Sequence, residues 1–306
     1  MTSRPLLTIG TRGSPLALAQ ARLVEEALRC AAPELAEPGA VAIQVIRTTG
    51  DAVQDRPLAE IGGKGLFTRE IEQALLDGHI DIAVHSYKDM PTVLPDGLVI
   101  PACLPRADPR DALICRAASR IEDLPQAALI GSASLRRAAQ ALALRPDLRV
   151  IPLRGSVGTR LRKLDEGQVQ ATFLAMAGLD RLGIADAPIH PLAPEAMLPA
   201  VAQGAIAIEL RQDDGRVRDL AARIGDAPTL RCTAAERALL AELDGSCRTP
   251  IAGLCVEAGD RLRLRGLVAS ADGRRVATAE RRGGLGEAEA MGRDAGRELR
   301  RSGLVG

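Results

Sequence analysis

The chain has 306 residues, of which 46% are hydrophobic and 26% are charged, and its formal net charge is +1. This composition is typical of a globular protein, and the length predicts two or three domains. A nearly neutral chain has no overall field that attracts a polyanion, so any anion site must be built locally. With 1% aromatic residues and no tryptophan, a stacking surface for single-stranded nucleic acid is excluded.

The positions of cysteines, histidines and apolar runs indicate whether the chain binds a metal, contacts a membrane, or belongs in the cytoplasm. The six cysteines form no C-x-x-C pair or zinc spacing and the three histidines are scattered, so we expect no metal site. No apolar run has transmembrane length and the N-terminus lacks the pattern of a signal peptide, so we expect a cytoplasmic protein without membrane contact. Four cysteines stand among apolar residues and are expected to be packed as small hydrophobic side chains: Cys30, Cys103, Cys115 and Cys255.

The first hundred residues have the pattern of an α/β domain. Apolar runs predict strands over 6–10, 41–46 and 81–85. Ser14 and Pro15 form an N-cap and first-turn pair that predicts the start of a helix. A second helix is expected over 66–76, and the polar, glycine-containing residues 48–63 are expected to form a long loop.

Two groups of prolines predict crossovers between domains. Prolines near residue 105 mark the entry into a second α/β domain, and prolines between 188 and 199 mark the return. The apolar run 204–210 is expected to rejoin the first sheet. A small third domain of the α+β class is predicted from a helix over 230–243, strands over 251–257, 261–268 and 275–282, and a last helix over 285–300.

The expected fold class is therefore α/β, with two periplasmic-binding-protein-like α/β domains joined by two crossovers, plus a small C-terminal α+β domain. The expected boundaries are 1–104 with 200–222 for domain 1, 105–199 for domain 2 and 223–306 for domain 3. Strand ends and helix N-termini are expected to face a cleft between the first two domains.

Two turns between a strand and a helix have the composition of an anion site. Residues 130–137 (IGSASLRR) and 153–160 (LRGSVGTR) each follow an apolar run and open a helical stretch. The first N–H groups of a helix have no partner within it and attract anions together with the helix dipole. The arginines add planar forks that bind carboxylates through two bonds. We expect both turns side by side at one sheet edge, as a site for a ligand with several negative charges.

Each of these residues also has an ordinary structural explanation. A serine N-cap stabilises any helix, and arginine is the usual base in this chain, whose only lysines are Lys64, Lys88 and Lys163. The pairing of the two turns, with Gly155 and Gly158 allowing close backbone approach, favours the functional alternative.

Asp89 and Cys247 have sequence neighbours that favour a catalytic carboxylate and a reactive thiolate, respectively. Asp89 follows a predicted strand, beside Lys88, in a segment that Pro91 keeps from being helical. A carboxylate there could stabilise a cationic intermediate or transfer a proton, and an Asx turn is the structural alternative. Cys247 lies in a tight turn before Arg248, where a thiolate is favoured, although an unpaired cysteine is often inert.

Seven segments together resemble the porphobilinogen deaminase family, also called hydroxymethylbilane synthases, from essentially end to end. They stand in the family's order at 11–18, 62–67, 81–91, 131–137, 153–161, 198–205 and the turn around Cys247. The resemblance implies a three-domain fold and a dipyrromethane cofactor attached to Cys247 through a thioether. It implies a transferase of tetrapyrrole and haem biosynthesis that condenses four porphobilinogen molecules on this primer, with loss of ammonia, and releases hydroxymethylbilane by hydrolysis. A monomer without nucleic-acid partners is expected.

The same resemblance implies roles for the matching residues. Asp89 would be the catalytic carboxylate, acting at the pyrrole nitrogens. The residues implied to hold the cofactor, besides Cys247, are Ser86, Lys88, Asp89, Ser132, Ser134, Arg136, Arg137, Arg154 and Gln203. Those implied to bind the substrate are Arg12, Ser14, Lys64, Phe67, Arg154 and Arg160. Five positions depart from the family's pattern and bear on carboxylate contacts and loop closure: Glu60, Tyr87, Ala133, Ser156 and Arg248.

The implied substrate suits these residues. Each porphobilinogen has two carboxylates, so the growing chain is a polyanion, and loss of ammonia leaves a pyrrole cation that a carboxylate such as Asp89 would stabilise.

Two other functions stay open for this sequence. One is a two-domain anion-binding receptor that closes about a hinge without catalysis. The other is thiol-dependent acyl transfer at Cys247, for which the sequence pairs none of His79, His85 and His190 with the thiol.

Overall fold

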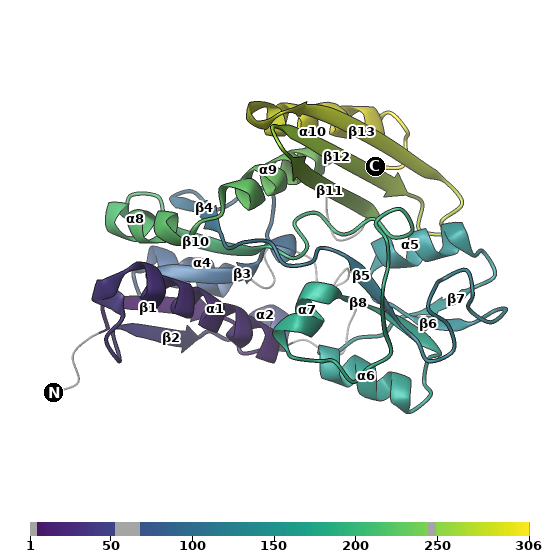
Figure 1. The fold of residues 1–306 in the computed structure, drawn as a ribbon, viewed down its shortest axis with the longest axis horizontal. Helices are drawn as coiled ribbons and strands as arrows, with labels where there is room; N and C mark the ends of the chain where they lie inside the picture. Colours follow the sequence, from purple (N-terminus) through teal and green to yellow (C-terminus); the bar gives the residue numbers. More distant parts are fainter. Residues whose placement is uncertain (1–4, 53–67, 244–248, 306) are drawn as a thin grey trace. The chain divides into compact units, whose positions relative to one another are not determined.

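The computed structural model describes residues 5–52, 68–243 and 249–305. The chain divides into two compact units, Met1–Arg106 with Ala205–Leu230, and Ala107–Gly204 with Arg231–Gly306. Figure 1 labels helices and strands of both units.

The first unit is built on a mixed sheet, which the described residues form from five strands in the order β2-β1-β3-β10-β4. The strands are β1 (Leu7–Thr11), β2 (Val41–Val45), β3 (Ile82–Ser86), β4 (Leu98–Cys103) and β10 (Ile206–Arg211). β1 runs parallel to β2 and β3, whereas β10 is antiparallel to both β3 and β4. The prediction that the run 204–210 rejoins the first sheet is therefore confirmed.

The first unit also contains several helices and short 3₁₀ turns. They are α1 (Pro15–Ala31), η1 (Pro33–Leu35), α2 (Thr49–Ala52), α4 (Arg69–Leu76), η2 (Tyr87–Asp89), α8 (Gly215–Ile224) and the start of α9 (Ala227–Glu242). α1 begins as predicted, with Pro15 in its first turn and the Ser14 hydroxyl accepting the Ala17 N–H at 3.3 Å. The short helix α2 lies in the segment expected to be a loop, which corrects that expectation for residues 49–52.

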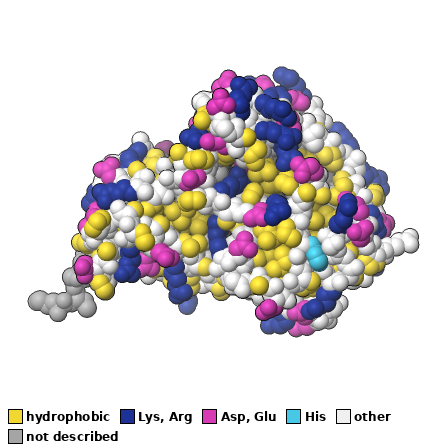
Figure 2. Space-filling model, in the orientation of Figure 1, with side chains coloured by type: hydrophobic (Ala, Val, Ile, Leu, Met, Phe, Trp, Pro, Cys, Tyr) yellow, Lys and Arg dark blue, Asp and Glu magenta, His cyan; other side chains and the backbone are white. Residues whose placement is uncertain are grey.

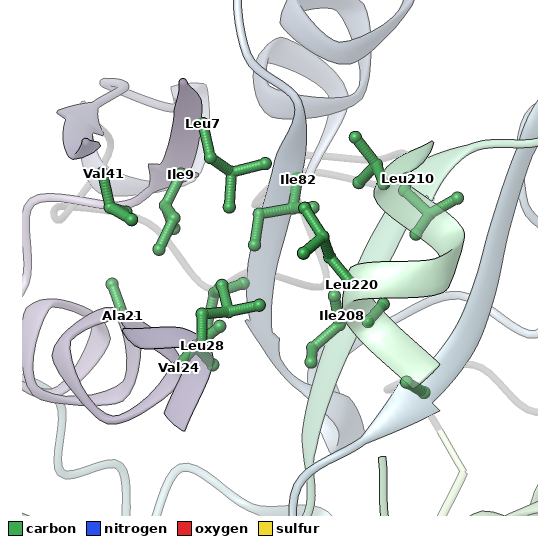
Figure 3. Packing of buried hydrophobic residues seen from close by; sticks show 14 of the residues in the cluster. Leu7, Ile9, Ala21, Val24, Leu28, Val41, Ile82, Ile208, Leu210 and Leu220 are labelled. Carbon is green, nitrogen blue, oxygen red and sulfur yellow. The ribbon is translucent and has the colours of Figure 1, made fainter. Parts of the chain in front are cut away.

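The hydrophobic core of the first unit lies between the sheet and the helices α1 and α8. Figure 3 shows Val24 and Leu28 of α1 pointing toward Ile9 and Ile82 of the sheet, with Leu220 of α8 beside the same core. Each large apolar side chain buried in this way contributes about 1.5–3 kcal/mol to the free energy of unfolding. A smaller cluster under α4 covers the opposite face of the sheet.

The second unit contains a sheet that the described residues form from five strands in the order β7-β6-β8-β5-β9. These are β5 (Asp111–Ile114), β6 (Leu129–Gly131), β7 (Arg149–Ile151), β8 (Ala171–Ala175) and β9 (Ile189–Pro191). The connecting helices are α5 (Leu135–Leu144), α6 (Val157–Asp165) and α7 (Met176–Arg181). Separate hydrophobic clusters around Phe173 and Leu179 cover this sheet.

The C-terminal part of the second unit is an antiparallel sheet packed against helices. β11 (Ile251–Ala258), β12 (Arg261–Ala269) and β13 (Val276–Gly284) pair in sequence order, followed by η3 (Leu285–Glu287) and α10 (Ala288–Arg300). Gly266 on β12 allows α9 to approach, because a Cβ there would lie 2.4 Å from Leu239 Cδ1. Lys/Arg and Asp/Glu side chains are interspersed over this part in Figure 2. The predicted α+β elements are confirmed, as is the α/β class of the fold.

The cysteine environments correct one expectation. Cys103, Cys115 and Cys255 are buried as predicted, and Cys232 is buried as well, but Cys30 is exposed. α1 buries a stripe that includes Val24 and Leu28, and Cys30 follows Leu28 by two residues, which places it on the other side of the helix. Among the helices of the described residues, none combines the length and apolar composition needed to cross a membrane.

Candidate functional site

The two predicted turns of the second unit lie side by side. β6 and β7 are parallel neighbours with Gly131 opposite Ile151, and the Ser132 N–H donates to Ile151 O at 2.8 Å. Gly131 is required here, because a Cβ would lie 2.6 Å from Leu153 Cδ2. The expectation that both turns share one sheet edge is confirmed.

The serines of these turns cap the two helices. Ser134 Oγ accepts the Arg137 N–H at 3.4 Å at the start of α5, and Ser156 Oγ accepts the Thr159 N–H at 3.2 Å at the start of α6. Ser132 Oγ accepts the Ser134 N–H at 3.1 Å. The structural explanation of Ser134 and Ser156 is therefore correct, and their predicted ligand contacts stay predictions.

Positive charge gathers at these turns. Burial, together with the nearby charges of Arg137 and Arg154, lowers the pKa of Arg160 to about 10. The Arg160 Nε donates to Gly155 O at 2.9 Å, and within the described part of the chain the guanidinium forms no ion pair. Crowded like charges favour the binding of an anion, because its charge relieves their repulsion. This geometry suits a ligand with several carboxylates.

Arg136 and Arg137 lie deeper, on a buried carboxylate that the sequence did not single out. Arg136 Nη1 lies 2.7 Å from Asp111 Oδ2, and Arg137 Nη2 lies 2.7 Å from Asp111 Oδ1. Gln203 Nε2 donates to the same Oδ1 at 2.9 Å. Burial alone would raise the pKa of Asp111, but the charges of the two arginines outweigh burial and hold that pKa well below its usual range. Three predicted ligand-binding side chains are thus brought together.

The first unit gathers its predicted residues at the ends of two parallel strands. β1 and β3 pair with Ile9 opposite Ile82, so both strands end at the same edge of the sheet. The chain leaving β1 carries Arg12 and Ser14, both half-buried, and β3 ends in Ser86 before Lys88 and Asp89. Carboxyl ends of parallel strands are where open α/β sheets bind ligands.

Asp89 is exposed at the end of a single 3₁₀ turn, Tyr87–Asp89. The expectation of a wholly non-helical segment is therefore wrong. The turn closes with the Met90 N–H donating to Tyr87 O at 3.2 Å, and Met90 is extended because it precedes Pro91. Within the described residues, the Asp89 carboxylate forms no hydrogen bond or ion pair, which leaves both oxygens available to a ligand.

Two polar contacts behind this edge escaped the sequence analysis. Gln20 of α1 is 2% exposed, and its amide donates to Ser86 Oγ at 2.9 Å. His85 Nε2 lies 3.0 Å from Glu209 Oε2 inside the unit. No local pattern could reveal them, because each lies in an apolar helix or strand and meets its partner across the fold.

The remaining predicted site residues fall outside the described residues: Lys64, Phe67 and Cys247, together with the departures Glu60 and Arg248. Two of the three histidines that acyl transfer at Cys247 would need as a partner have other contacts, since His85 Nε2 lies 3.0 Å from Glu209 Oε2 and His190 Nε2 lies 3.0 Å from Cys115 O. Among the described residues, no group of three His, Cys, Asp or Glu side chains could hold a metal ion.

Comparison with known proteins decides between the functions left open. The family described as "Porphobilinogen deaminase, dipyromethane cofactor binding domain" matches residues 7–219, and "Porphobilinogen deaminase, C-terminal domain" matches residues 230–301. The chain belongs to the porphobilinogen deaminase family.

Curated relatives agree with this assignment over nearly the whole chain. A porphobilinogen deaminase from Nitrobacter hamburgensis is 55% identical over 96% of this chain and 93% of its own length. One from Paracoccus denitrificans is 56% identical with the same coverages of 96% and 93%. A putative methionine-binding lipoprotein from Bacillus subtilis has a solved structure with a TM-score of 0.44 and 13% identity, covering 72% of this chain and 90% of its own.

The family assignment bears on cofactor and function. The domain that matches residues 7–219 is the dipyromethane cofactor binding domain of the porphobilinogen deaminases, so the predicted cofactor is confirmed. The described residues fit such a group, because the charges of Arg137 and Arg154 crowd the half-buried Arg160 guanidinium, and a bound anion would relieve that repulsion. A receptor without catalysis is not favoured. The roles of individual residues stay predictions.

Proposed function

We propose that this chain is a transferase that condenses four porphobilinogen molecules head to tail, with loss of ammonia, and then releases hydroxymethylbilane by hydrolysis. The observation that carries the proposal is the family match over residues 7–219 and 230–301. The arginine-rich turns support it because the substrate is a polyanion. The exposed Asp89 carboxylate, which forms no hydrogen bond or ion pair within the described residues, supports it because the substrate becomes cationic at the reacting centre.

Asp89 is proposed as the catalytic carboxylate. Its oxygens are accessible at the end of β3, and the short 3₁₀ turn fixes the backbone that carries them. A carboxylate in this position accepts hydrogen bonds from pyrrole N–H groups and stabilises positive charge that develops as ammonia leaves. Stabilisation of this kind acts on the transition state more strongly than on the neutral substrate, and therefore raises the rate.

Arginines and hydroxyls are proposed to bind the acetate and propionate groups. Arg154 and Arg160 supply forks that bind a carboxylate through two bonds, and Ser132 and Ser134 stand at the start of α5, where the helix dipole favours an anion. Residues of the first unit complete the proposed set: Arg12, Ser14, Lys64, Phe67, Ser86 and Lys88. Arg136, Arg137 and Gln203 are proposed to contact the cofactor.

Cys247 is proposed to hold the cofactor through a thioether. When bound, the dipyrromethane supplies the primer to which porphobilinogen is joined. The chain contributes the thiolate, which Arg248 as a cationic neighbour favours. Retention of the growing product by a covalent bond lets one protein molecule carry out successive condensations without losing intermediates.

The proposed domain boundaries are those expected from the sequence. Domain 1 comprises 1–104 with 200–222, domain 2 comprises 105–199 and domain 3 comprises 223–306. A cytoplasmic monomer that binds no nucleic acid and no membrane is proposed, since its substrate is a small molecule and its net charge is +1.

Intact mass and peptide mapping of the purified protein test this function. We expect a stable adduct of two pyrrole units, located on the peptide that contains Cys247 and on no other cysteine peptide. Turnover is measured in parallel as consumption of porphobilinogen. A protein that consumes porphobilinogen while Cys247 is unmodified contradicts the attachment site. A protein whose mass equals the sequence mass and which binds porphobilinogen without consuming it is a receptor.

A further inference from the structure

One buried carboxylate joins three of the side chains proposed to contact the cofactor. Asp111 is the first residue of β5 and is fully buried, with 0% of its surface exposed. Its Oδ2 accepts a hydrogen bond from Arg136 Nη1 at 2.7 Å. Its Oδ1 accepts hydrogen bonds from Arg137 Nε at 3.0 Å, from Arg137 Nη2 at 2.7 Å and from Gln203 Nε2 at 2.9 Å. Both oxygens of the carboxylate are therefore hydrogen-bonded, Oδ2 to one arginine and Oδ1 to the other arginine and the glutamine.

Backbone carbonyls fix the same three side chains at a second point. Arg136 Nη1 also donates to Leu198 O, Arg137 Nη1 to Phe173 O and Gln203 Nε2 to Pro109 O, each at 2.8 Å. A side chain held at two points has lost its rotamer freedom before any ligand binds. Binding to such a preformed array costs less conformational entropy than binding to mobile arginines.

The net charge of Arg136, Arg137 and Asp111 together favours the binding of an anion. Two buried guanidinium groups face one carboxylate, so the cluster carries one net positive charge. Without Asp111, the two guanidinium groups would lie together in a low-dielectric interior without a counter-ion, which is strongly unfavourable. With Asp111 they are stabilised as a pair, and one positive charge stays available to a ligand carboxylate.

We propose that Asp111 is a positioning residue that holds Arg136, Arg137 and Gln203 as one preformed array for a carboxylate of the pyrrole cofactor. The identity of that ligand rests on the proposed function. Asp111 itself has no exposed surface and acts only through the three side chains that it holds.

Variants of the arginines do not test this proposal. Replacing Arg136 by leucine removes a group that contacts the ligand, and it also leaves the buried Asp111 carboxylate short of a partner. Substitution of Asp111 separates the two effects, because both arginines stay in the chain. Asp111→Asn removes the charge and one acceptor, whereas Asp111→Glu keeps the charge and moves it by one methylene.

The experiment compares full-length wild-type protein with Asp111→Asn, Asp111→Glu and Asp147→Asn. Asp147→Asn is the matched control, since Asp147 belongs to the same unit and lies 2.7 Å from Arg145 Nε in an ion pair that touches none of the proposed ligand contacts. The folded fraction of each protein is purified, its melting temperature is measured, and the fraction of molecules that carry the pyrrolic adduct is read from the intact mass.

We expect the adduct-bearing fraction to fall by roughly tenfold in Asp111→Asn, as for the loss of hydrogen bonds between charged groups, and to be unchanged in Asp147→Asn. Asp111→Glu should also lose adduct, because a shifted charge no longer holds the array. A merely structural role would lower the melting temperature of the Asp111 variants and leave the adduct fraction of the folded protein at the wild-type value.

Each outcome of this experiment either supports or overturns the positioning role of Asp111. A folded Asp111→Asn protein with the wild-type adduct fraction overturns this inference alone. If Asp111→Asn does not fold, Asp111→Glu decides: a reduced adduct fraction in its folded protein supports the positioning role, and a full adduct overturns it. Wild-type protein that carries no adduct overturns the proposed function, and the assignment of the array to a pyrrole carboxylate falls with it.

Discussion

His85 on β3 and Glu209 on β10 face each other with 3.0 Å between Nε2 and Oε2, and their side chains are only 4% and 0% exposed. Glu72 of α4 is buried against the same face of the sheet. Burial raises the pKa of Glu72, and the charge of Glu209 raises it further. The face of the sheet opposite α1 thus buries three titratable groups.

Glu72→Gln is predicted to stabilise the protein at neutral pH. The pKa of Glu72 is higher in the folded chain than in the unfolded chain, so the folded state binds more protons above the ordinary value of 4.5. The free energy of unfolding therefore falls as the pH rises from about that value through the raised pKa. Glutamine cannot ionise, and its variant should lose less stability over this range in denaturant titrations.

Glu70→Gln on the same helix is the control with the opposite sign. Burial raises the pKa of Glu70, but hydrogen bonds from Thr49 outweigh burial and lower it. Its stabilising contribution is present at neutral pH and disappears as the pH falls through the lowered pKa. Glu70→Gln should thus lower the free energy of unfolding at neutral pH. Equal effects of the two substitutions would contradict this account of the α4 carboxylates.

Arg160→Gln is predicted to stabilise the ligand-free protein and to weaken substrate binding. The side chain is half-buried near two like charges, so its charge is unfavourable in the folded state until an anion binds. In a Cys247→Ser background, the substitution should raise the free energy of unfolding by roughly 1 kcal/mol after the lost hydrogen bond to Gly155 is subtracted. In otherwise wild-type protein, KM for porphobilinogen should rise by about tenfold.

Arg149→Gln is the matched control for this prediction, because Arg149 is exposed at the start of β7 in the same unit. It should change neither the stability nor KM. A ligand-free Arg160→Gln protein that is less stable than its parent would show that the arginine is structural.

Asp89→Ala is predicted to lower kcat by about a hundredfold or more, because it removes the charge that faces the developing cation. The fold should be intact, since the carboxylate is exposed and forms no hydrogen bond or ion pair within the described residues. Asp89→Glu should keep part of the activity, because the charge survives at a shifted position. The measurement is turnover at saturating porphobilinogen together with the melting temperature.

Asp96→Ala serves as the control for Asp89, since Asp96 is another exposed aspartate of the same unit. Its turnover should equal that of the wild type. Near-normal kcat in Asp89→Ala would remove the catalytic role from this residue.

Local patterns predicted much of the fold, because they encode short-range physics. The start of α1 at Pro15 followed from its capping residues, and the strands of the C-terminal sheet followed from strand-like runs in the sequence. Cys30 shows the limit of this reasoning. Its neighbours in the sequence are apolar, but helical periodicity decides which of them face the core, and Cys30 faces outward.

The sequence predicted the residues of the two turns in the candidate site but not the buried residues that hold them in place. The turns around Ser132 and Ser156 have a local signature of strand, glycine, hydroxyl and arginine. Asp111 has none, because it meets Arg136 and Gln203 from 25 and 92 positions away in the sequence. Contacts at such separations depend on strand order, which hydrophobic patterns alone do not specify.

Gln20→Leu is the last prediction and tests one such support. The amide of Gln20 both donates to and accepts from the Ser86 hydroxyl, at 2.9 and 3.0 Å, and it is 2% exposed. Leucine has a similar size but leaves the half-buried hydroxyl without this partner, so the free energy of unfolding should fall by about 1–2 kcal/mol. If Ser86 contacts the ligand, a hydroxyl that turns away should also raise KM for porphobilinogen. Gln73→Leu, at an exposed position of α4 whose amide bonds only to Asp77 in the described residues, should leave both quantities unchanged. A loss of stability in Gln20→Leu with unchanged KM would assign Ser86 to the scaffold and remove it from the ligand-binding set.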